Sequence, residues 1–299
     1  EFRRVLFRSF PLARLGSPAQ REAHLAPMLE GKASLALAAT EAQSRYDVAD
    51  VLTRATKSNG GYHLHGSKRW VLNGHAADTI LVSARTSGTE RERGGISLFL
   101  VDRATPGLTI TPVKTMDGHH AAMLTLDDVA LGADHLLGAE GEALPALEEA
   151  MDLGAAAACA EGVGITRAAL AMTTEYLRTR EQFGVKIGSF QALQHRAVDM
   201  FIETELCKST SILASLKVGD LDVEERKSAI SAAKVQLAVG GRFVTQQAIQ
   251  LHGGIGVTDE YIGSHYFKRL TMLEMAFGDS MHQLGEVSAR MQDTAGVFA

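Results

Sequence analysis

Cysteine, tryptophan and proline are scarce in this sequence, which has two, one and six of them among 299 residues. Two cysteines exclude a disulfide framework, and both Cys159 and Cys207 lie within apolar helical patterns. We therefore expect buried free thiols in a reducing compartment, with a cytoplasmic location as the default.

Charge of one sign and long apolar runs are also lacking. The sequence has 30 basic and 35 acidic residues, a formal net charge of -5. This mild acidity gives no electrostatic footprint for nucleic acid or an anionic membrane. No uninterrupted apolar run reaches the roughly 18 residues of a bilayer span. We expect no nucleic acid partner and no membrane span.

Signatures of metal sites and of serine hydrolases are missing. His63 and His65 alternate along one expected strand face, but no third ligand stands at metal-binding spacing nearby. The Gly-x-Ser-x-Gly motif is absent. We expect no metal site.

The beginning of the sequence also lacks the apolar core and cleavage site of a signal peptide. Residues Phe2–Ser9 read like a translated sequencing-adapter oligonucleotide, so we interpret residues 1–9 as an artefact. The alternative is an ordinary basic amphipathic start.

The residue pattern changes along the sequence, which is long enough for about two domains. A helical pattern over Glu22–Leu29 stops at Gly31. It lies in residues 10–33, which we treat as a separate segment. Residues 34–140 contain short β-like runs with turns at Asn59-Gly60-Gly61, Asn73-Gly74 and Pro106-Gly107. This pattern predicts an antiparallel β-barrel or sandwich. The runs that we expect to be strands are 62–66, 68–72, 79–84, 96–101 and 108–113.

Residues 141–299 are helical in pattern. We predict helices over Leu147–Thr179, Phe190–Val218 and Val223–Leu251, and a fourth from about Tyr266 toward the C-terminus. Asp222, before Glu224 and Glu225, is a typical helix start because acidic residues there complement the helix dipole. Four long helices with short connections predict an antiparallel four-helix bundle, and the fold class is α+β.

Two motifs in the helical part are more specific. The first is Arg178–Gly184 (RTREQFG) with the following Phe190–His195 (FQALQH), and the second is Gln250–Gly256 (QLHGGIG). Together, in this order, they resemble the acyl-CoA dehydrogenase family, flavoenzymes that desaturate acyl-CoA thioesters. The resemblance implies an N-terminal helical domain, a middle β-domain and a C-terminal four-helix bundle. Residues 10–33 would then be the remnant of a first domain that is otherwise missing. Segments 40–47, 265–271 and 277–279 look closest to one branch, the small subunit of pimeloyl-CoA dehydrogenase and related bacterial enzymes.

The resemblance implies FAD as cofactor. Thr40 would lie along the isoalloxazine edge and Trp70 would cover the ring, although Leu72 replaces the usual hydroxyl residue two positions later. Arg180 would contact the pyrophosphate of a neighbouring subunit's FAD, a role suited to its fixed fork of donors. The remaining positions would contact the adenine side or cradle the dinucleotide. They are Phe183, Gln191, Gln250, Gly253 and Gly254. Because these residues would serve the flavin of a neighbouring subunit, the resemblance implies an oligomer. The alternatives are a barrel-core tryptophan, a surface arginine, a core phenylalanine and glycines that only end a helix.

The catalytic base is a departure from the family pattern. Desaturation needs a carboxylate near the substrate α-carbon, but the usual glutamate position falls on Phe277 and its alternative on Gly154. Another carboxylate, Glu161 or Asp279, could replace it; a partner subunit could carry it; or the fold could serve another reaction. Alternatively, Glu161 pairs with a buried cation and Asp279 is a structural turn carboxylate.

The expected function is FAD-dependent oxidation of an acyl-CoA, possibly dicarboxylic, to the trans-2-enoyl-CoA. The expected partners are acyl-CoA, further copies or a larger homologous subunit, and a flavoprotein electron acceptor. The second hypothesis is a non-catalytic subunit that contributes FAD contacts to a catalytic partner. A third is a flavin-dependent oxidase or monooxygenase on the same scaffold.

Overall fold

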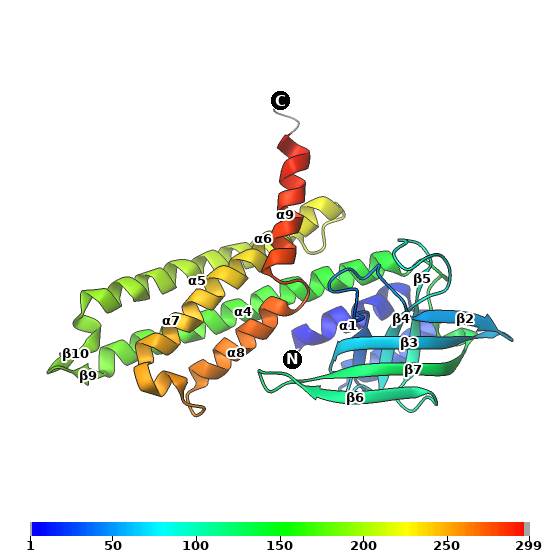
Figure 1. Ribbon diagram of the computed structural model, residues 1–299, viewed down its shortest axis with the longest axis horizontal. Helices are drawn as coiled ribbons and strands as arrows, with labels where there is room; N and C mark the ends of the chain where they lie inside the picture. The colour runs from blue at the N-terminus through cyan, green and yellow to red at the C-terminus, as the bar shows by residue number, and fades with distance from the viewer. Residues whose placement is uncertain (1, 296–299) are drawn as a thin grey trace. The chain divides into compact units, whose positions relative to one another are not determined.

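The computed structural model describes residues 2–295, and the chain forms two compact units, Glu1–Met151 and Asp152–Ala299 (Figure 1). Each unit is described by itself below.

The first unit begins with α1 (Phe2–Leu15), α2 (Pro18–Gln20), the π-helical η1 (Arg21–Leu25) and α3 (Ala26–Leu29). Ser17 and Gln20 form a capping box, and the Gln20 amide also donates to the carbonyls of Asp134 and Leu136. The predicted helix end before Gly31 is confirmed, since Gly31 has φ +72°. The foreign origin of residues 1–9 stays a prediction.

An eight-stranded sheet forms the rest of this unit, with the order β6-β7-β3-β2-β4-β5-β8 and with β1 also paired to β4. Its interior is a continuous cluster of buried aliphatic side chains around Phe99 and Tyr62, which meet edge to face. The strands are β1 (Leu35–Ala38), β2 (Arg54–Ser58), β3 (Gly61–Leu72), β4 (Thr79–Arg85), β5 (Ile96–Asp102), β6 (Leu108–Lys114), β7 (His120–Gly132) and β8 (Leu136–Leu137), with the 3-10 turn η2 (Ala133–His135) before β8.

All five predicted runs lie in strands, but the purely antiparallel prediction is wrong. β1 runs parallel to β4 through Leu35–Ala38, and β2 has a parallel contact with β4 at Arg54 and Arg85. The chain crosses over between these strands instead of turning back in a hairpin, and short-range turn chemistry does not encode such a crossover. The pairings of the described strands leave β6 and β8 as the ends of the sheet, so barrel closure stays a prediction.

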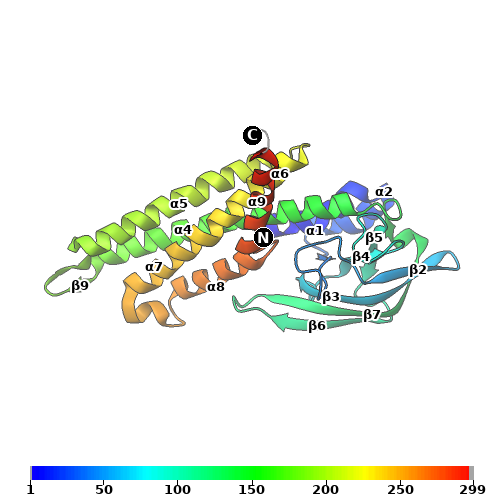
Figure 2. The ribbon, with the colours of Figure 1, turned by 45° about the horizontal axis from the view of Figure 1, so that its top comes forward.

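The second unit is built from long helices (Figures 1 and 2). α4 (Leu144–Thr179), which begins in the first unit, leads into the hairpin β9 (Glu181–Gln182) and β10 (Val185–Lys186) and the 3-10 turn η3 (Ile187–Ser189). The next helices are α5 (Gln191–Lys217), α6 (Val223–Gln236), the π-helical η4 (Leu237–Gly241) and α7 (Arg242–His252). The 3-10 turn η5 (Gly253–Val257), α8 (Ile262–Met275) and α9 (Ser280–Ala295) complete the unit.

The predicted helices are present, with two corrections. The third contains the π-helical turn η4, where Gly240 and Gly241 pack closely against neighbouring side chains. The fourth is wrong as a single helix, since α8 ends before Phe277 and Gly278, which have φ of +59° and +102°. The helix start at Asp222 is confirmed, because its carboxylate accepts from the Glu224 and Glu225 amides.

α4 is the one described helix that is long and apolar enough, by length and composition, to cross a membrane. Core helices of soluble proteins pass the same test. Asp152 on α4 binds Arg226 of α6, and Glu161 binds Arg269 of α8. These ion pairs join α4 to two other helices of the same unit.

Both cysteines are free and buried, as expected. Burial raises the pKa of Cys159 to about 12 and that of Cys207 to about 11, so neither is a thiolate at neutral pH.

Candidate functional site

The two motif segments lie on one groove of about 700 Å³ in the helical unit. The end of α4 and the hairpin contribute Arg180 and Gln182, and the end of α7 contributes Gln250, Gly253 and Gly254. Four of the predicted cofactor residues are therefore brought together although 70 residues separate Arg180 from Gln250. The remaining lining residues are Tyr176, Ile187, Ala192, Leu193, Arg196, Leu251, His252 and Ile255.

The hairpin turns at Phe183 and Gly184, with φ of +56° and +75°. Positive φ at both central residues is the backbone of a two-residue hairpin turn, and glycine adopts it without strain. The Phe183 ring is 91% exposed and its centroid lies 6.2 Å from that of Phe190. Phe183 and Gln191, also predicted to contact the nucleotide, are not among the residues that line the groove.

The glycine turn is open. Gly253 has φ +60°, and no heavy atom would lie within 4 Å of a Cβ at Gly253 or Gly254. The positive φ requires glycine at position 253, whereas the open space lets a ligand approach the backbone. Packing inside this part of the bundle therefore does not explain the glycine pair.

An aromatic stack around the buried His252 supports this turn, and the sequence did not predict it. The ring of His252 lies between those of Tyr176 and Tyr261, with both centroid distances 4.4 Å. The Tyr261 hydroxyl lies 2.9 Å from His252 Nδ1, and burial lowers the pKa of His252 and raises that of Tyr261 to about 12. A neutral histidine fixed by two rings holds the residue before Gly253. The position of His252 directly before the Gly-Gly pair was the only signal in the sequence.

These residues fit the dinucleotide part of FAD. Arg180 is exposed on the groove, and within the described residues its guanidinium makes no hydrogen bond or ion pair, so it is available to an anion. Arg196 on the same groove donates to Gln247 Oε1 at 3.1 Å. Two cationic forks beside an accessible backbone turn are suited to phosphate oxygens.

The two positions where the resemblance places the base contact each other. A Cβ built on Gly154 would lie 2.4 Å from Cε1 of Phe277, so the phenyl ring covers the glycine backbone directly. The apolar cluster of the bundle includes Phe277. An aromatic ring therefore fills this place, and it leaves no room for a side chain at position 154.

The two substitute carboxylates are both engaged. Glu161 receives two hydrogen bonds from Arg269, Nε to Oε1 at 2.7 Å and the second guanidinium nitrogen to Oε2 at 3.0 Å. Asp279 accepts from the His282 amide at 2.9 Å at the start of α9. These contacts match the structural alternatives stated for both residues: a partner for a cation and a turn carboxylate.

A buried lysine fixes the segment before Phe277. Lys234 of α6 is 1% exposed, and its ammonium donates to the carbonyls of Leu273, Glu274 and Ala276 at 2.6–2.9 Å. A cation at the end of α8 complements the helix dipole and satisfies carbonyls that have no helical partner. Burial nevertheless lowers the Lys234 pKa to about 8.

The predicted flavin-ring residues lie in the first unit. The amide of Arg69 donates to the carbonyl of Thr40 at 2.8 Å, which joins the segment after β1 to β3. The next residue, Trp70, has φ +54° at a register shift of β3 and is 53% exposed. This bulge turns the ring away from the sheet interior, so the alternative of a barrel-core tryptophan is wrong.

A buried ion pair lies beneath this bulge and was not predicted. Lys68 Nζ donates to Glu41 Oε1 at 2.7 Å and to Ser83 Oγ at 2.8 Å, and Glu41 also accepts the amides of Leu52 and Thr53. Burial alone would raise the Glu41 pKa, but Lys68 and these donors hold it at about 2. Burial lowers the Lys68 pKa to about 8, against the opposing effect of Glu41.

The two histidines of the strand face have separate partners. His63 Nδ1 lies 2.7 Å from Asp128 Oδ1, and His65 Nδ1 lies 3.6 Å from Asp127 Oδ1. Each histidine therefore faces its own aspartate of β7.

Comparison with known proteins agrees with this arrangement. Residues 36–129 match the acyl-CoA dehydrogenase middle domain, and residues 144–292 match the acyl-CoA dehydrogenase C-terminal domain. The chain is 32% identical over 273 residues to the probable acyl-CoA dehydrogenase YngJ of Bacillus subtilis (strain 168), covering 90% of this chain and 71% of that protein. It is also 32% identical to the short-chain specific acyl-CoA dehydrogenase of Megasphaera elsdenii, over 92% of this chain and 72% of that protein.

Solved structures share the fold. Butyryl-CoA dehydrogenase from Megasphaera elsdenii superposes with a TM-score of 0.85 at 28% identity, over 97% of this chain and 76% of that one. The FAD complex of PigA has a TM-score of 0.90 at 25% identity, with the same coverage. With this fold, the two matched domains and these relatives, the chain belongs to the acyl-CoA dehydrogenase family.

Proposed function

We propose that this chain binds FAD within an oligomeric acyl-CoA dehydrogenase that oxidises an acyl-CoA thioester to the trans-2-enoyl-CoA. The observation that carries the proposal is the groove that Arg180 shares with the Gly253 turn. This groove presents guanidinium groups and the accessible backbone of the glycine turn to one ligand. Bound FAD would accept the hydride from the substrate β-carbon. PigA, a relative of known structure, was solved with FAD.

The chain's own residues would hold the nucleotide. Arg180 and Arg196 would bind phosphate oxygens, and the Tyr176–His252–Tyr261 stack would keep the turn rigid. We propose Thr40 and Trp70 for the flavin ring, since Trp70 presents an exposed aromatic face. Phe183, with its exposed ring, remains a candidate contact for the adenine, and Gln191 for the same end of the nucleotide.

A second candidate function follows from the contact between Phe277 and Gly154. A phenyl ring cannot remove a proton, and Glu161 and Asp279 are held by other partners. These observations favour a subunit that contributes FAD contacts while a homologous partner supplies the base. The branch resemblance to the small subunit of pimeloyl-CoA dehydrogenase supports the same arrangement and a dicarboxylic acyl group. A flavoprotein remains the proposed electron acceptor.

Glu161 can be tested separately from its structural role because its ion-pair partner offers a matched control. Glu161→Gln removes the carboxylate and the ion pair, whereas Arg269→Gln removes the ion pair and keeps the carboxylate. The enzyme, co-expressed with any partner subunit, is assayed for turnover with an artificial electron acceptor. If this chain supplies the base through Glu161, turnover falls at least about 100-fold in Glu161→Gln only. Equal, small losses in both variants assign Glu161 to structure.

Asp279→Asn is assayed in parallel, because Asn also accepts hydrogen bonds at a helix start. Retention of turnover in both carboxylate variants would leave the non-catalytic subunit as the function. A purified assembly that carries no flavin and bleaches none with acyl-CoA would contradict the flavoenzyme proposal as a whole.

A further inference from the structure

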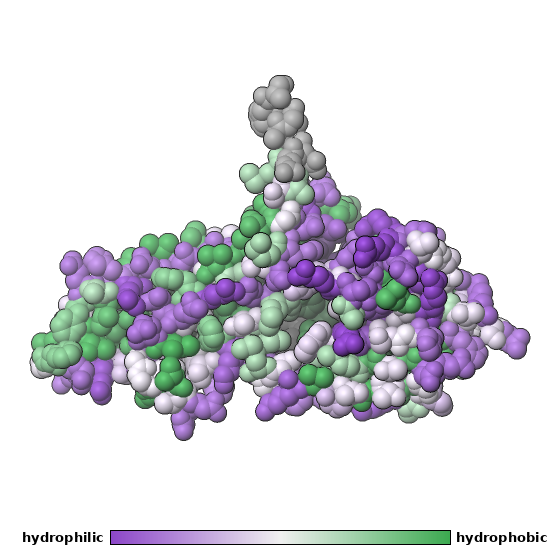
Figure 3. All heavy atoms as spheres, viewed as in Figure 1, coloured by the Kyte–Doolittle hydropathy of each residue, from purple (hydrophilic) through white to green (hydrophobic). Residues whose placement is uncertain are grey.

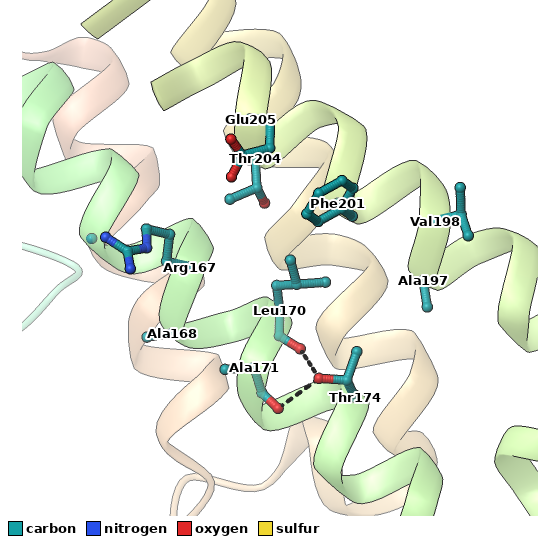
Figure 4. A pocket seen from close by; sticks show the side chains of 11 residues that line it. Arg167, Ala168, Leu170, Ala171, Thr174, Ala197, Val198, Phe201, Thr204 and Glu205 are labelled. Atoms are coloured by element: carbon teal, nitrogen blue, oxygen red, sulfur yellow. Dashed lines mark hydrogen bonds between the residues drawn. The ribbon is translucent and has the colours of Figure 1, made fainter. Parts of the chain in front are cut away.

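A hollow of about 740 Å³ lies between α4 and α5 of the helical unit (Figure 4). Two of its polar lining groups are engaged within their own helices. The Thr174 hydroxyl donates to the carbonyls of Leu170 and Ala171, and Glu205 accepts a hydrogen bond from Lys208. These contacts point to no ligand. The first unit, by contrast, buries two opposite charges side by side.

Charged side chains normally lie at the surface, and hydrophilic residues cover much of the face seen in Figure 3. Lys68 is instead 0% exposed, and Glu41 is 4% exposed. Replacing a buried ion pair by apolar groups often costs no stability, whereas the bonds of such a pair can fix one arrangement of the backbone. The burial of these charges is therefore best explained by the geometry that the pair holds.

Strand β3 departs from regular alternation directly after Lys68. Side chains of a strand point alternately to its two faces, so Trp70 would share the interior face with Lys68. The next interior residue is instead Val71, because Lys68 pairs with Leu124 and Val71 pairs with Ala122. One extra residue therefore stands on β3, and this bulge turns Trp70 to the outside with φ +54°.

A positive φ at a bulky residue persists only where the surrounding contacts enforce it. The ion pair supplies contacts at the start of the bulge. The Lys68 ammonium lies 2.7 Å from Glu41 Oε1 and 2.8 Å from Ser83 Oγ of β4. Glu41 is in turn fixed by the amides of Leu52 and Thr53, at 2.8 and 3.1 Å. The bulge therefore starts from a side chain that is anchored, directly or through Glu41, to three other segments.

We propose that the Lys68–Glu41 pair positions two flavin contacts, the Trp70 ring and the Thr40 backbone. Thr40 directly precedes Glu41, and Trp70 follows Lys68 by two residues. The amide of Arg69 joins the two segments, because it donates to the Thr40 carbonyl at 2.8 Å. The inference rests on the proposed function. Both charged groups are buried and do not touch the cofactor, so they are positioning residues.

The test uses a double variant, Glu41→Gln with Lys68→Met, which leaves no unpaired charge in the interior. Gln keeps an oxygen that accepts from the backbone amides, and Met keeps the length of the lysine side chain without its ammonium. The matched control is Lys114→Met, which removes an exposed lysine of β6 in the same unit. Circular dichroism shows whether each variant is folded.

The first measurement is the quenching of tryptophan fluorescence by acrylamide in the flavin-free chain. Trp70 is the only tryptophan, so the signal reports this ring alone. The residue is 53% exposed, and a ring that becomes freely accessible in the double variant should be quenched about twofold faster. The control should match the wild type. No rise in quenching in a folded double variant would overturn the proposal, and so would a double variant that does not fold.

The second measurement is the visible absorption spectrum of FAD bound to the same chains. Loss of the Trp70 contact should shift the flavin bands of the double variant toward those of free FAD, whereas the control keeps the wild-type spectrum. Identical spectra of the double variant and the wild type would contradict the positioning of the flavin contacts. A wild type that takes up no flavin would contradict the proposed function, and the quenching result would still decide whether the pair holds the ring.

Discussion

At Gly154 the absence of a side chain has a clear physical reason. The Phe277 ring lies against its Cα, where a Cβ would approach the ring within 2.4 Å. Sequence reasoning identified both positions as lacking a carboxylate, but it could not show that they touch. Their contact depends on the break between α8 and α9, which positive φ at Phe277 and Gly278 creates.

We predict that Gly154→Ala lowers the free energy of unfolding by about 1–3 kcal/mol, because the added methyl overpacks against Phe277. The control is Gly164→Ala on the same helix, where nothing lies within 4 Å of the new Cβ. At position 164 the higher helix propensity of alanine should raise the free energy of unfolding by up to about 1 kcal/mol. Urea denaturation measures both, and equal effects of the two substitutions would contradict the contact.

The buried Glu41–Lys68 pair predicts a pH dependence of stability. The Glu41 pKa is about 2 in the folded chain and near 4.5 when unfolded, so its stabilisation is complete above about pH 4.5. It is lost as the pH falls toward 2, because the unfolded chain binds the proton first. The free energy of unfolding, measured between pH 5 and 2.5, should fall less steeply in Glu41→Gln than in the wild type. Identical slopes would contradict this account.

At the scale of elements, periodicity and caps predicted most of the helical unit. α4, α5 and the start of α6 follow apolar spacing and the Asp222 cap, which are local signals. The break after α8 was missed because it depends on a distant residue: Lys234 of α6 caps the carbonyls at its end. The parallel pairing of β1 with β4 was missed for the same reason, since it joins segments 44 residues apart.

We predict that Lys234→Met destabilises the chain by about 2–4 kcal/mol, because three buried carbonyls lose a charged donor. Lys227→Met, on the same helix but half-exposed, should cost less than about 1 kcal/mol. Chemical denaturation measures the free energy of unfolding of both variants. An equal loss of stability in the two would contradict the capping role of Lys234.

For the whole molecule, the sequence predicted which residues meet on the groove but not what surrounds them. Arg180, Gln250, Gly253 and Gly254 were named from motifs that resemble a family, and they share one surface. The three rings of the Tyr176–His252–Tyr261 stack come from three separate segments of the chain. No local sequence motif therefore predicted the stack.

The central claim is that this groove holds the nucleotide half of FAD, and the affinity of variants for FAD tests it most directly. Arg180→Ala should weaken flavin binding about 10- to 100-fold, the range expected for the loss of a charge-assisted hydrogen bond. Arg178→Ala, which removes an exposed arginine of α4 that does not line the groove, is the matched control. The measurement is a titration of the flavin-stripped assembly with FAD, followed by flavin fluorescence. Weakening in Arg180→Ala alone is the predicted result, and equal affinity of both variants and the wild type would contradict the account.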